Sequence, residues 1–272
     1  MNQKNPLISD SLMEGQFLFL GTGASMGTPV VTCKCKVCRS AGRHNHRLRP
    51  SGLLKLDGKQ ILFDAGPDFR EQALRAGIDS LDGVVLTHGH YDHIAGLDDL
   101  RVFYFLKHQT LPCLLSRPTF HEIKTKSPYF FGGSGDDVMG GSRFDFKVMD
   151  EQYGDLIFCN FPWKFMSYIQ NGMQVTGYRI GNFAYIMDLK EYTPSIFESL
   201  KGVEVLVLSG LRDRHSPAHL TLDEALSFSK KVGAKKTWFS HVSHELDHEE
   251  TNSRLPEEAQ LAYDGLEVSF IC

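Results

Sequence analysis

The chain of 272 residues is 42% hydrophobic and 23% charged, a composition typical of a globular protein with a sizeable core. Its formal charge of -4 disfavours broad nucleic-acid binding, which favours a basic surface, but permits a small anionic substrate held by local cations or a metal. No apolar run is long enough to span a membrane, and residues 1–15 lack the apolar stretch of a secretion signal, which predicts a cytoplasmic protein.

Short apolar runs bounded by turn residues predict strands along the whole chain. In chain order they cover residues 17–20, 53–56, 61–63, 84–86, 144–148, 156–158, 174–180, 183–187, 203–208, 237–239 and 266–270. Asp57-Gly58 separates the second run from the third and predicts a hairpin. Helical spacing predicts helices over 69–76, 97–106 and 222–232, the last followed by Gly233 as a stop signal.

No repeat or linker divides the chain, which predicts one domain over residues 1–272, with helices covering the outer faces of its sheets. We expect residues 1–15 to be flexible. The glycine-rich stretch 127–142 has little periodicity and predicts a mobile loop. His248 follows Glu245-Leu246-Asp247 and is expected to be exposed.

The sharpest feature is a cluster of metal-binding residue types directly after the predicted strand 84–86. Its sequence is Thr-His-Gly-His-Tyr-Asp-His and contains His88, His90, Asp92 and His93. In an extended segment His88 and His90 point to the same side, and the other two follow where the chain turns. Nitrogen and oxygen donors of this kind suit zinc, manganese or iron(II) better than calcium or magnesium.

Three of the six cysteines, Cys33, Cys35 and Cys38, lie close together in the chain. Cysteines this near rarely reach disulfide geometry with one another, and in a reducing compartment such clusters more often hold metal. Tetrahedral zinc would need a fourth ligand. Free thiols in a surface loop are the alternative.

The His-x-His-x-Asp-His motif after a hydrophobic strand resembles the metallo-β-lactamase superfamily of hydrolases. The resemblance runs from about residue 17 to residue 271. It includes Gly-Thr-Gly-Ala-Ser at 21–25, Ile-Leu-Phe-Asp-Ala-Gly at 61–66, Ala-Tyr-Ile-Met-Asp at 184–188 and Ser-His-Val-Ser-His at 240–244. The Cys-x-Cys-x-x-Cys insertion is similar to that of the PhnP-like branch, named for a phosphodiesterase that acts on cyclic ribose phosphates.

The resemblance implies an α+β fold, a four-layer αββα sandwich with a two-metal site along one sheet edge. It also implies that the first metal is bound by His88 and His90, the second by Asp92, His93 and His241, and both by a bridging Asp188. Asp64 would orient a ligand histidine. His244 would be the fourth ligand of a structural zinc site with the three cysteines. The active-site metals would be zinc or manganese, with iron as a further option.

One position departs from the family pattern. The family expects a third histidine for the first metal, eight residues before the tyrosine of a Gly-Tyr-Arg segment. Gly177-Tyr178-Arg179 is present, but the expected position holds Gln170. An amide oxygen is a weaker ligand than imidazole for these metals. We therefore expect a looser first site, with Gln170 as a candidate ligand.

The expected reaction is hydrolysis of a phosphodiester in a small cyclic or nucleotide-like phosphate, by attack of a metal-bound hydroxide. The leaving alkoxide needs a proton donor, and His219 is the candidate. We also predict that Asp92 is a catalytic residue. A capping or surface role for His219 is the alternative. We expect a small phosphorylated substrate as partner, no membrane and no nucleic acid, and leave a homodimer open.

Other interpretations of the function remain open. The superfamily also contains lactonases, thioesterases, tRNA-processing nucleases and β-lactamases, so the fold alone does not select a substrate. The PqqB branch of cofactor biosynthesis shares the cysteine insertion. A non-enzyme alternative is a degenerate metal-binding protein that keeps the structural zinc but no longer turns over, an alternative that Gln170 keeps open.

Overall fold

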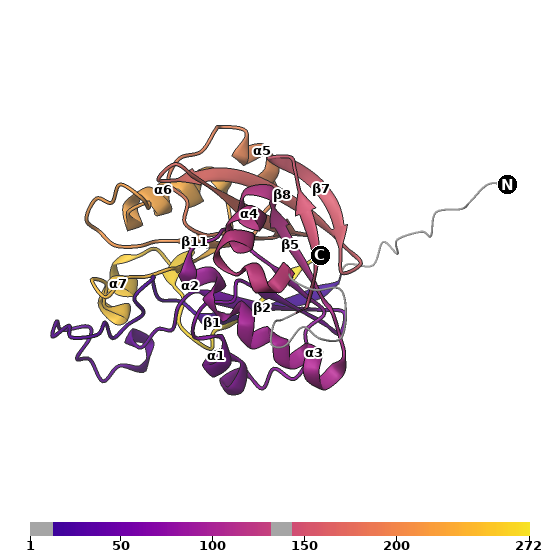
Figure 1. The fold of residues 1–272 in the computed structure, drawn as a ribbon. Helices are drawn as coiled ribbons and strands as arrows, with labels where there is room; N and C mark the ends of the chain where they lie inside the picture. Colours follow the sequence, from indigo (N-terminus) through magenta and orange to yellow (C-terminus); the bar gives the residue numbers. More distant parts are fainter. Residues whose placement is uncertain (1–12, 132–142) are drawn as a thin grey trace.

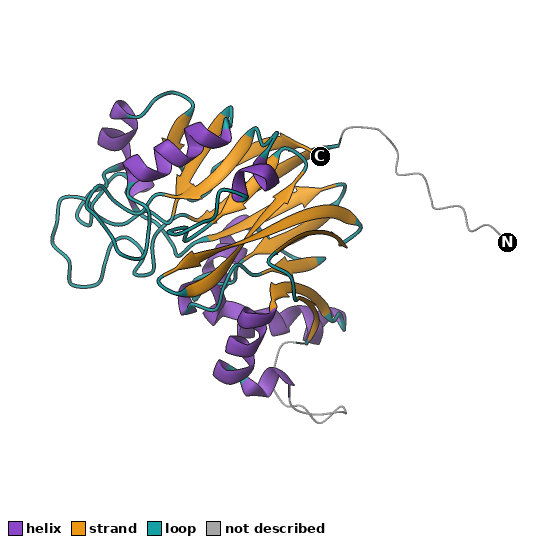
Figure 2. Ribbon diagram, turned by 90° about the horizontal axis from the view of Figure 1, so that it is seen from above, coloured by secondary structure: helices purple, strands orange, loops and turns teal. Residues whose placement is uncertain are grey.

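A computed structural model describes residues 13–131 and 143–272, and the expectation of a mobile loop over 127–142 falls mainly outside these ranges. Two seven-stranded sheets pack face to face, with helices on both outer sides (Figure 2). This is the four-layer αββα arrangement that the resemblance implied. No helix in the described ranges is long and apolar enough to cross a membrane.

The first sheet has the strand order β14-β1-β2-β3-β4-β5-β6. The strands β2, β3 and β4 stand at its centre, and β3, β4, β5 and β6 run parallel. Its strand bounds are β1 Glu14–Gly21, β2 Ser51–Leu56, β3 Lys59–Phe63, β4 Gly83–Val85, β5 Leu111–Ser116, β6 Phe144–Met149 and β14 Glu267–Ile271.

The second sheet has the order β13-β12-β11-β10-β9-β8-β7, and its strands β10 to β13 run parallel. Its bounds are β7 Tyr153–Phe158, β8 Phe161–Gln170, β9 Met173–Ile180, β10 Phe183–Ile186, β11 Val205–Ser209, β12 Lys236–Ser240 and β13 Ala259–Leu261.

The helices form the two outer layers and the short connections at the sheet edge. They are α1 Phe69–Ala76, α2 Tyr91–Ile94, α3 Arg101–Lys107, α4 Arg117–Lys126, α5 Ile196–Leu200, α6 Leu222–Val232 and α7 His248–Arg254 (Figure 1). Three 3₁₀ turns lie at Arg43–Asn45, Ala95–Leu100 and Pro128–Phe131. The last of these occupies the start of the stretch that the sequence predicted as a loop.

Three hydrophobic clusters separate the layers. The cluster between the sheets is aromatic, with Phe17 and Phe63 from the first sheet against Phe183 and Tyr185 from the second. A second cluster lies under α5 and α6, and a third under α1 to α4. Burial of both faces explains why inner strands such as β10 and β11 are nearly continuous apolar runs, whereas edge strands such as β6 and β7 alternate between half-buried and exposed residues.

Two expectations from the sequence were wrong: that residues 13–15 are flexible and that His248 is exposed. Residues 13–15 belong to the ordered sheet, because Met13 exchanges backbone hydrogen bonds with Cys272 and β1 starts at Glu14 between β2 and β14. His248 is buried rather than exposed, since the first turn of α7 packs against Arg47 and Tyr263.

Candidate metal centre

The histidine-rich motif lies where β4 ends. His88 follows β4 in an extended segment, His90 is the residue before α2, and His93 lies inside α2. His88 and His93 are fully buried, whereas His90 is exposed. The Nδ1 atom of His90 is 3.0 Å from Nε2 of His88, so both rings converge on one region. The motif thus places imidazoles at the carboxyl end of a parallel strand, where ligand sites of such sheets occur.

Asp188, just after β10 in the other sheet, is the centre of the arrangement. Its Oδ2 atom lies 3.2 Å from His88 Nε2 and 3.4 Å from His93 Nε2. Its Oδ1 atom lies 3.2 Å from His241 Nε2 and 3.5 Å from His219 Nδ1. One buried carboxylate therefore faces two imidazole nitrogens with each of its oxygens.

Asp92 forms a second group with two of these rings. Its Oδ2 is 3.4 Å from His241 Nε2 and 3.6 Å from His93 Nε2. His93 thus belongs both to this group and to the group formed by His88 and Asp188. All six residues that the resemblance implied as active-site ligands lie at this edge, with Asp188 next to both halves of the set.

Asp64, at the end of β3, lies behind the ligand-type residues. It is fully buried, and its Oδ2 accepts from His93 Nδ1 at 2.7 Å. Its Oδ1 accepts from the backbone N–H of Thr87 at 2.8 Å. Asp64 therefore fixes the ring of His93 so that Nε2 points toward Asp92 and Asp188, as expected for a residue that orients a metal ligand.

Thr87 contacts two residues of the candidate site, and the sequence analysis did not assign it. Its hydroxyl donates to Asp64 Oδ2 at 2.9 Å and lies 2.9 Å from His88 Nδ1. Because Nδ1 of His88 is engaged on this side, Nε2 is left for the centre. Only its position directly before the histidine motif could have indicated these contacts, and a single threonine is too common to predict them.

Burial and charge act in opposite directions on these groups. Burial lowers the pKa of His88 to about 4, and Asp188 opposes that shift only partly. Burial also disfavours charge on His93, but Asp64 and Asp92 outweigh it and raise the pKa of His93 well above its usual value. Burial raises the pKa of Asp188, but His241 and the other rings outweigh it and hold the pKa well below its ordinary range. Asp188 is therefore an anion at neutral pH.

This donor set fits divalent cations. Both oxygens of Asp188 and Nε2 of His93 are buried and have no hydrogen-bond partner within the described ranges. A buried carboxylate without hydrogen bonds is costly unless a cation compensates it. Imidazoles and carboxylates of this kind are the ligands of zinc, manganese and iron.

Three residues of the centre have left-handed backbone conformations. Asp64, Asp188 and His241 each follow a strand closely, with φ of 55°, 54° and 56°. Non-glycine residues adopt this region at a cost of about 1–3 kcal/mol, and such positions cluster at functional sites. The turn at each strand end directs the three side chains toward the same edge.

The other two residues predicted for the site lie beside Asp188. The ring of His219 stacks on that of His241, with centroids 5.0 Å apart at 27°. The Gln170 side chain, at the end of β8, is 2% exposed, and its Nε2 lies 3.2 Å from Nε2 and 3.5 Å from Nδ1 of His219. Its Oε1 is buried and unpaired among the described residues.

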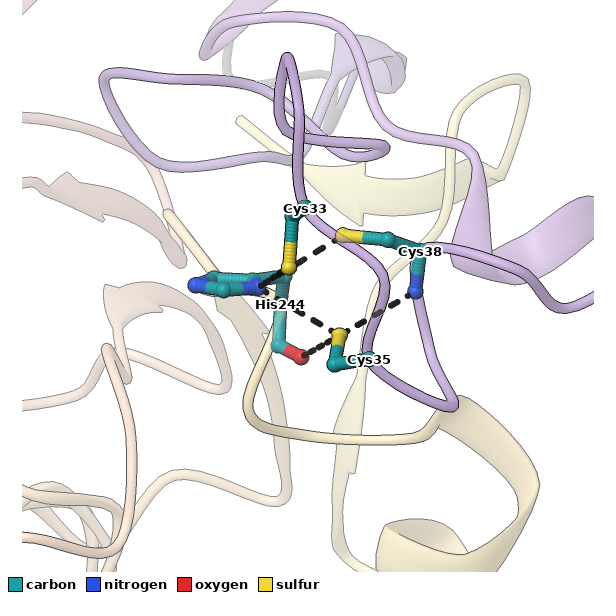
Figure 3. Close-up of side chains that lie close together, drawn as sticks. All are labelled: Cys33, Cys35, Cys38 and His244. Carbon is teal, nitrogen blue, oxygen red and sulfur yellow. Dashed lines mark hydrogen bonds between the residues drawn. The ribbon is translucent and has the colours of Figure 1, made fainter.

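The cysteine cluster lies within the loop between β1 and β2 and forms a second group of metal-binding residue types. The Sγ atoms of Cys33, Cys35 and Cys38 lie 3.3, 3.5 and 3.5 Å from Nδ1 of His244 (Figure 3). The backbone N–H of Cys38 donates to Cys35 and is the main cause that lowers the pKa of that thiol to about 6. Three sulfurs around one imidazole nitrogen match a closed Cys₃His zinc site.

The comparisons with known proteins agree with this architecture. The family model for the beta-lactamase superfamily domain matches residues 59–242, and the chain belongs to that superfamily. The crystal structure of a diphosphatase from the PhnP family is 38% identical, covers 96% of this chain and 99% of its own, and superposes with a TM-score of 0.87. The resemblance to the PhnP-like branch is confirmed, and fold and neighbour together support a hydrolase.

Two further relatives extend the picture. A Porphyromonas gingivalis protein called octanoyltransferase is 38% identical over 256 residues, which are 92% of this chain and 50% of that protein. The chain thus spans half the length of that relative. Zinc-bound PqqB from Methylobacterium extorquens has a TM-score of 0.73 at 19% identity, covering 93% of this chain and 99% of its own, and shares the fold.

Proposed function

We propose that this protein is a metal-dependent hydrolase that cleaves a phosphodiester or diphosphate bond in a small phosphorylated molecule. The observation that carries the proposal is the Asp188 carboxylate, buried, ionised and facing four imidazole nitrogens. The diphosphatase named for the similar PhnP-family structure supports phosphorus–oxygen chemistry.

In this proposal His88 and His90 hold one cation and Asp92, His93 and His241 hold a second, with Asp188 between them. Zinc or manganese fits these donors, and iron(II) also does. Such ions polarise a phosphoryl oxygen, neutralise developing charge and lower the pKa of bound water. The chain itself keeps His93 in one orientation through Asp64 and excludes solvent from Asp188 and His88 by burial.

Asp92 and His219 are the residues proposed for proton transfer and substrate contact. His219 is 13% exposed and lies at the rim of the buried ligand set, 3.5 Å from Asp188. A ring at the rim can reach a leaving oxygen while the deeper rings cannot. Its role as proton donor stays a prediction.

The cysteine cluster is proposed to hold a structural zinc ion. It joins the loop that follows β1 to the loop that follows β12, next to α7 (Figure 1). Lys36 and Glu250, and Asn45 and Asp247, connect the same two regions. Because no ligand position of a Cys₃His site stays open, the role would be structural.

A second candidate function is metal binding without turnover, which the Gln170 position favours because imidazole is expected there. Metal content and hydrolysis, measured together, separate the two candidates. The purified protein should contain three metal equivalents per chain and hydrolyse bis(p-nitrophenyl) phosphate or diadenosine diphosphate with added zinc or manganese. Full metal content without hydrolysis of either substrate would favour the non-catalytic alternative.

A further inference from the structure

We propose that His219 is a ligand of the metal centre and that Gln170 is the residue that orients it. The family expects a ligand nitrogen from position 170, and this inference places an imidazole nitrogen of His219 beside Asp188 and His241 instead. It rests on the proposed metal site but not on the proposed substrate or reaction. It replaces the proton-donor role of His219, because both ring nitrogens of His219 are then engaged.

The position of His219 carries the first step. Its nitrogen, a carboxylate oxygen of Asp188 and a nitrogen of His241 all lie within 4.8 Å of one another, as ligands of one cation do. The closest pairs are His219 Nδ1 to Asp188 Oδ1 at 3.5 Å and His241 Nε2 to the same oxygen at 3.2 Å. A surface or helix-capping histidine would not stack on His241 beside a buried carboxylate whose oxygens have no hydrogen-bond partner among the described residues.

Gln170 supplies the second step. Its amide end lies closer to Nε2 of His219 than to Nδ1, at 3.2 Å against 3.5 Å, while its own oxygen is buried without a partner among the described residues. The oxygen and nitrogen of a glutamine amide are distinguished only by their hydrogen bonds. Turning the amide by 180° puts Oε1 beside Nε2 of His219, where it accepts the ring proton, and moves the amide nitrogen to the buried position that Oε1 held.

The consequence is a defined tautomer. With its proton on Nε2 and donated to Gln170, His219 presents the lone pair of Nδ1 to Asp188 and His241. Ligand histidines are held in this way by a carbonyl or carboxylate oxygen on their other nitrogen. Gln170 then contributes to metal binding through His219, which differs from the direct ligand role that the sequence suggested for it.

Metal content tests the proposal without any turnover. Zinc per chain is measured after gel filtration for the full-length protein, and cobalt(II) absorption reports the donors around the ion. We expect His219→Ala to lose one equivalent, and Gln170→Leu, which keeps the volume but accepts no proton, to weaken binding about 10–100-fold. Gln170→Glu, which still accepts the Nε2 proton, should retain the metal. His215→Ala, on the same loop and exposed, is the matched control.

Two outcomes overturn the proposal. One is unchanged zinc content and cobalt spectrum in His219→Ala. The other is loss of a metal in Gln170→Leu together with full content in His219→Ala, which would make Gln170 the ligand. His219→Gln, with a polar side chain of similar reach, replaces His219→Ala if that variant does not fold. Absence of hydrolysis in the unaltered protein would contradict the proposed function, but it would not affect the metal-content measurements that test the role of His219.

Discussion

His241 and His244, close neighbours in the loop that follows β12, belong to two different ligand groups. Nε2 of His241 faces Asp92 and Asp188, whereas Nδ1 of His244 faces the three cysteine sulfurs. Between them, the backbone N–H of Val242 donates to Thr22, and Val242 O accepts from Ala24. The cysteine cluster therefore fixes the chain segment that presents His241.

This coupling gives the first prediction. Cys35→Ser should lower the zinc content by more than the one structural ion, because the segment that presents His241 loosens as well. We expect a fall in Tm of at least about 5 °C, since a structural ion contributes to folding. Zinc content and thermal unfolding are measured beside Cys272→Ser, which lies outside the cluster. Loss of a single zinc with unchanged Tm would contradict the coupling.

Asp64 gives the second. Asp64→Ala leaves His93 Nδ1 and the Thr87 N–H buried without an acceptor. Removing one partner of such a buried pair costs about 3–5 kcal/mol of unfolding free energy, and metal affinity should fall about 10–100-fold. Asp64→Asn keeps one oxygen acceptor and should lose less. Urea unfolding and zinc titration check both values, and equal losses in the two variants would argue against the hydrogen bonds as the cause.

Gly89, between His88 and His90, gives the third. A Cβ atom there would lie 2.2 Å from Oε2 and 2.9 Å from Cβ of Glu122 in α4. Lys126 donates to the Gly89 carbonyl at 2.6 Å and holds the loop against the same helix. Gly89→Ala should cost about 1–3 kcal/mol through overpacking and weaken zinc binding.

The matched test is the double variant Gly89→Ala with Glu122→Gly, which removes every side-chain atom of Glu122 that the new Cβ would meet. Zinc affinity should return toward that of Glu122→Gly alone. If the double variant binds zinc as poorly as Gly89→Ala, the clash with α4 is not the reason for the glycine.

His248 gives a pH prediction. Arg47 donates to its Nδ1 at 3.0 Å, and burial followed by the Arg47 charge lowers the pKa of His248 to about 4. The folded protein therefore favours the neutral ring. Its contribution to stability is complete above the unfolded pKa of about 6.5 and is lost as pH falls toward 4.

The effect amounts to about 1–3 kcal/mol across this window. His248→Gln does not titrate, so the stability difference between it and the unaltered protein should shrink as pH falls from 7 to 5. Urea unfolding of both proteins at each pH makes the comparison, and acid release of metal is common to the two. A difference that is constant with pH would show that His248 does not carry the dependence.

Local signals explain which elements were predicted well. The helix over residues 222–232 has the predicted bounds because Thr221 and Glu224 form a capping box and Gly233 adopts a left-handed conformation after it. The longest strand of the second sheet, β8, was not predicted. Its residues are buried on both faces at Phe165–Tyr168, so alternation is lost, and Pro162 argued against a strand.

The residues of the site also differ in how far the sequence alone could predict them. The compact histidine motif could be predicted because its donors are adjacent in the chain. Asp188 and His241 are unremarkable alone and were found only through family resemblance. The contact between Gln170 and His219 joins the end of β8 to the loop before α6, and no local sequence pattern predicts it.

The left-handed conformations of Asp64, Asp188 and His241 lower the stability of the fold at the residues that form the metal centre. Glycine or asparagine would relieve each of these turns, and each exchange would remove a donor or its support. At position 64 the loss of the buried acceptor outweighs this relief, so a library screened only for heat resistance in the absence of metal should enrich such exchanges at positions 188 and 241. Stability and metal binding therefore place opposite demands on these two residues, and a variant selected for stability alone is expected to lose its metals.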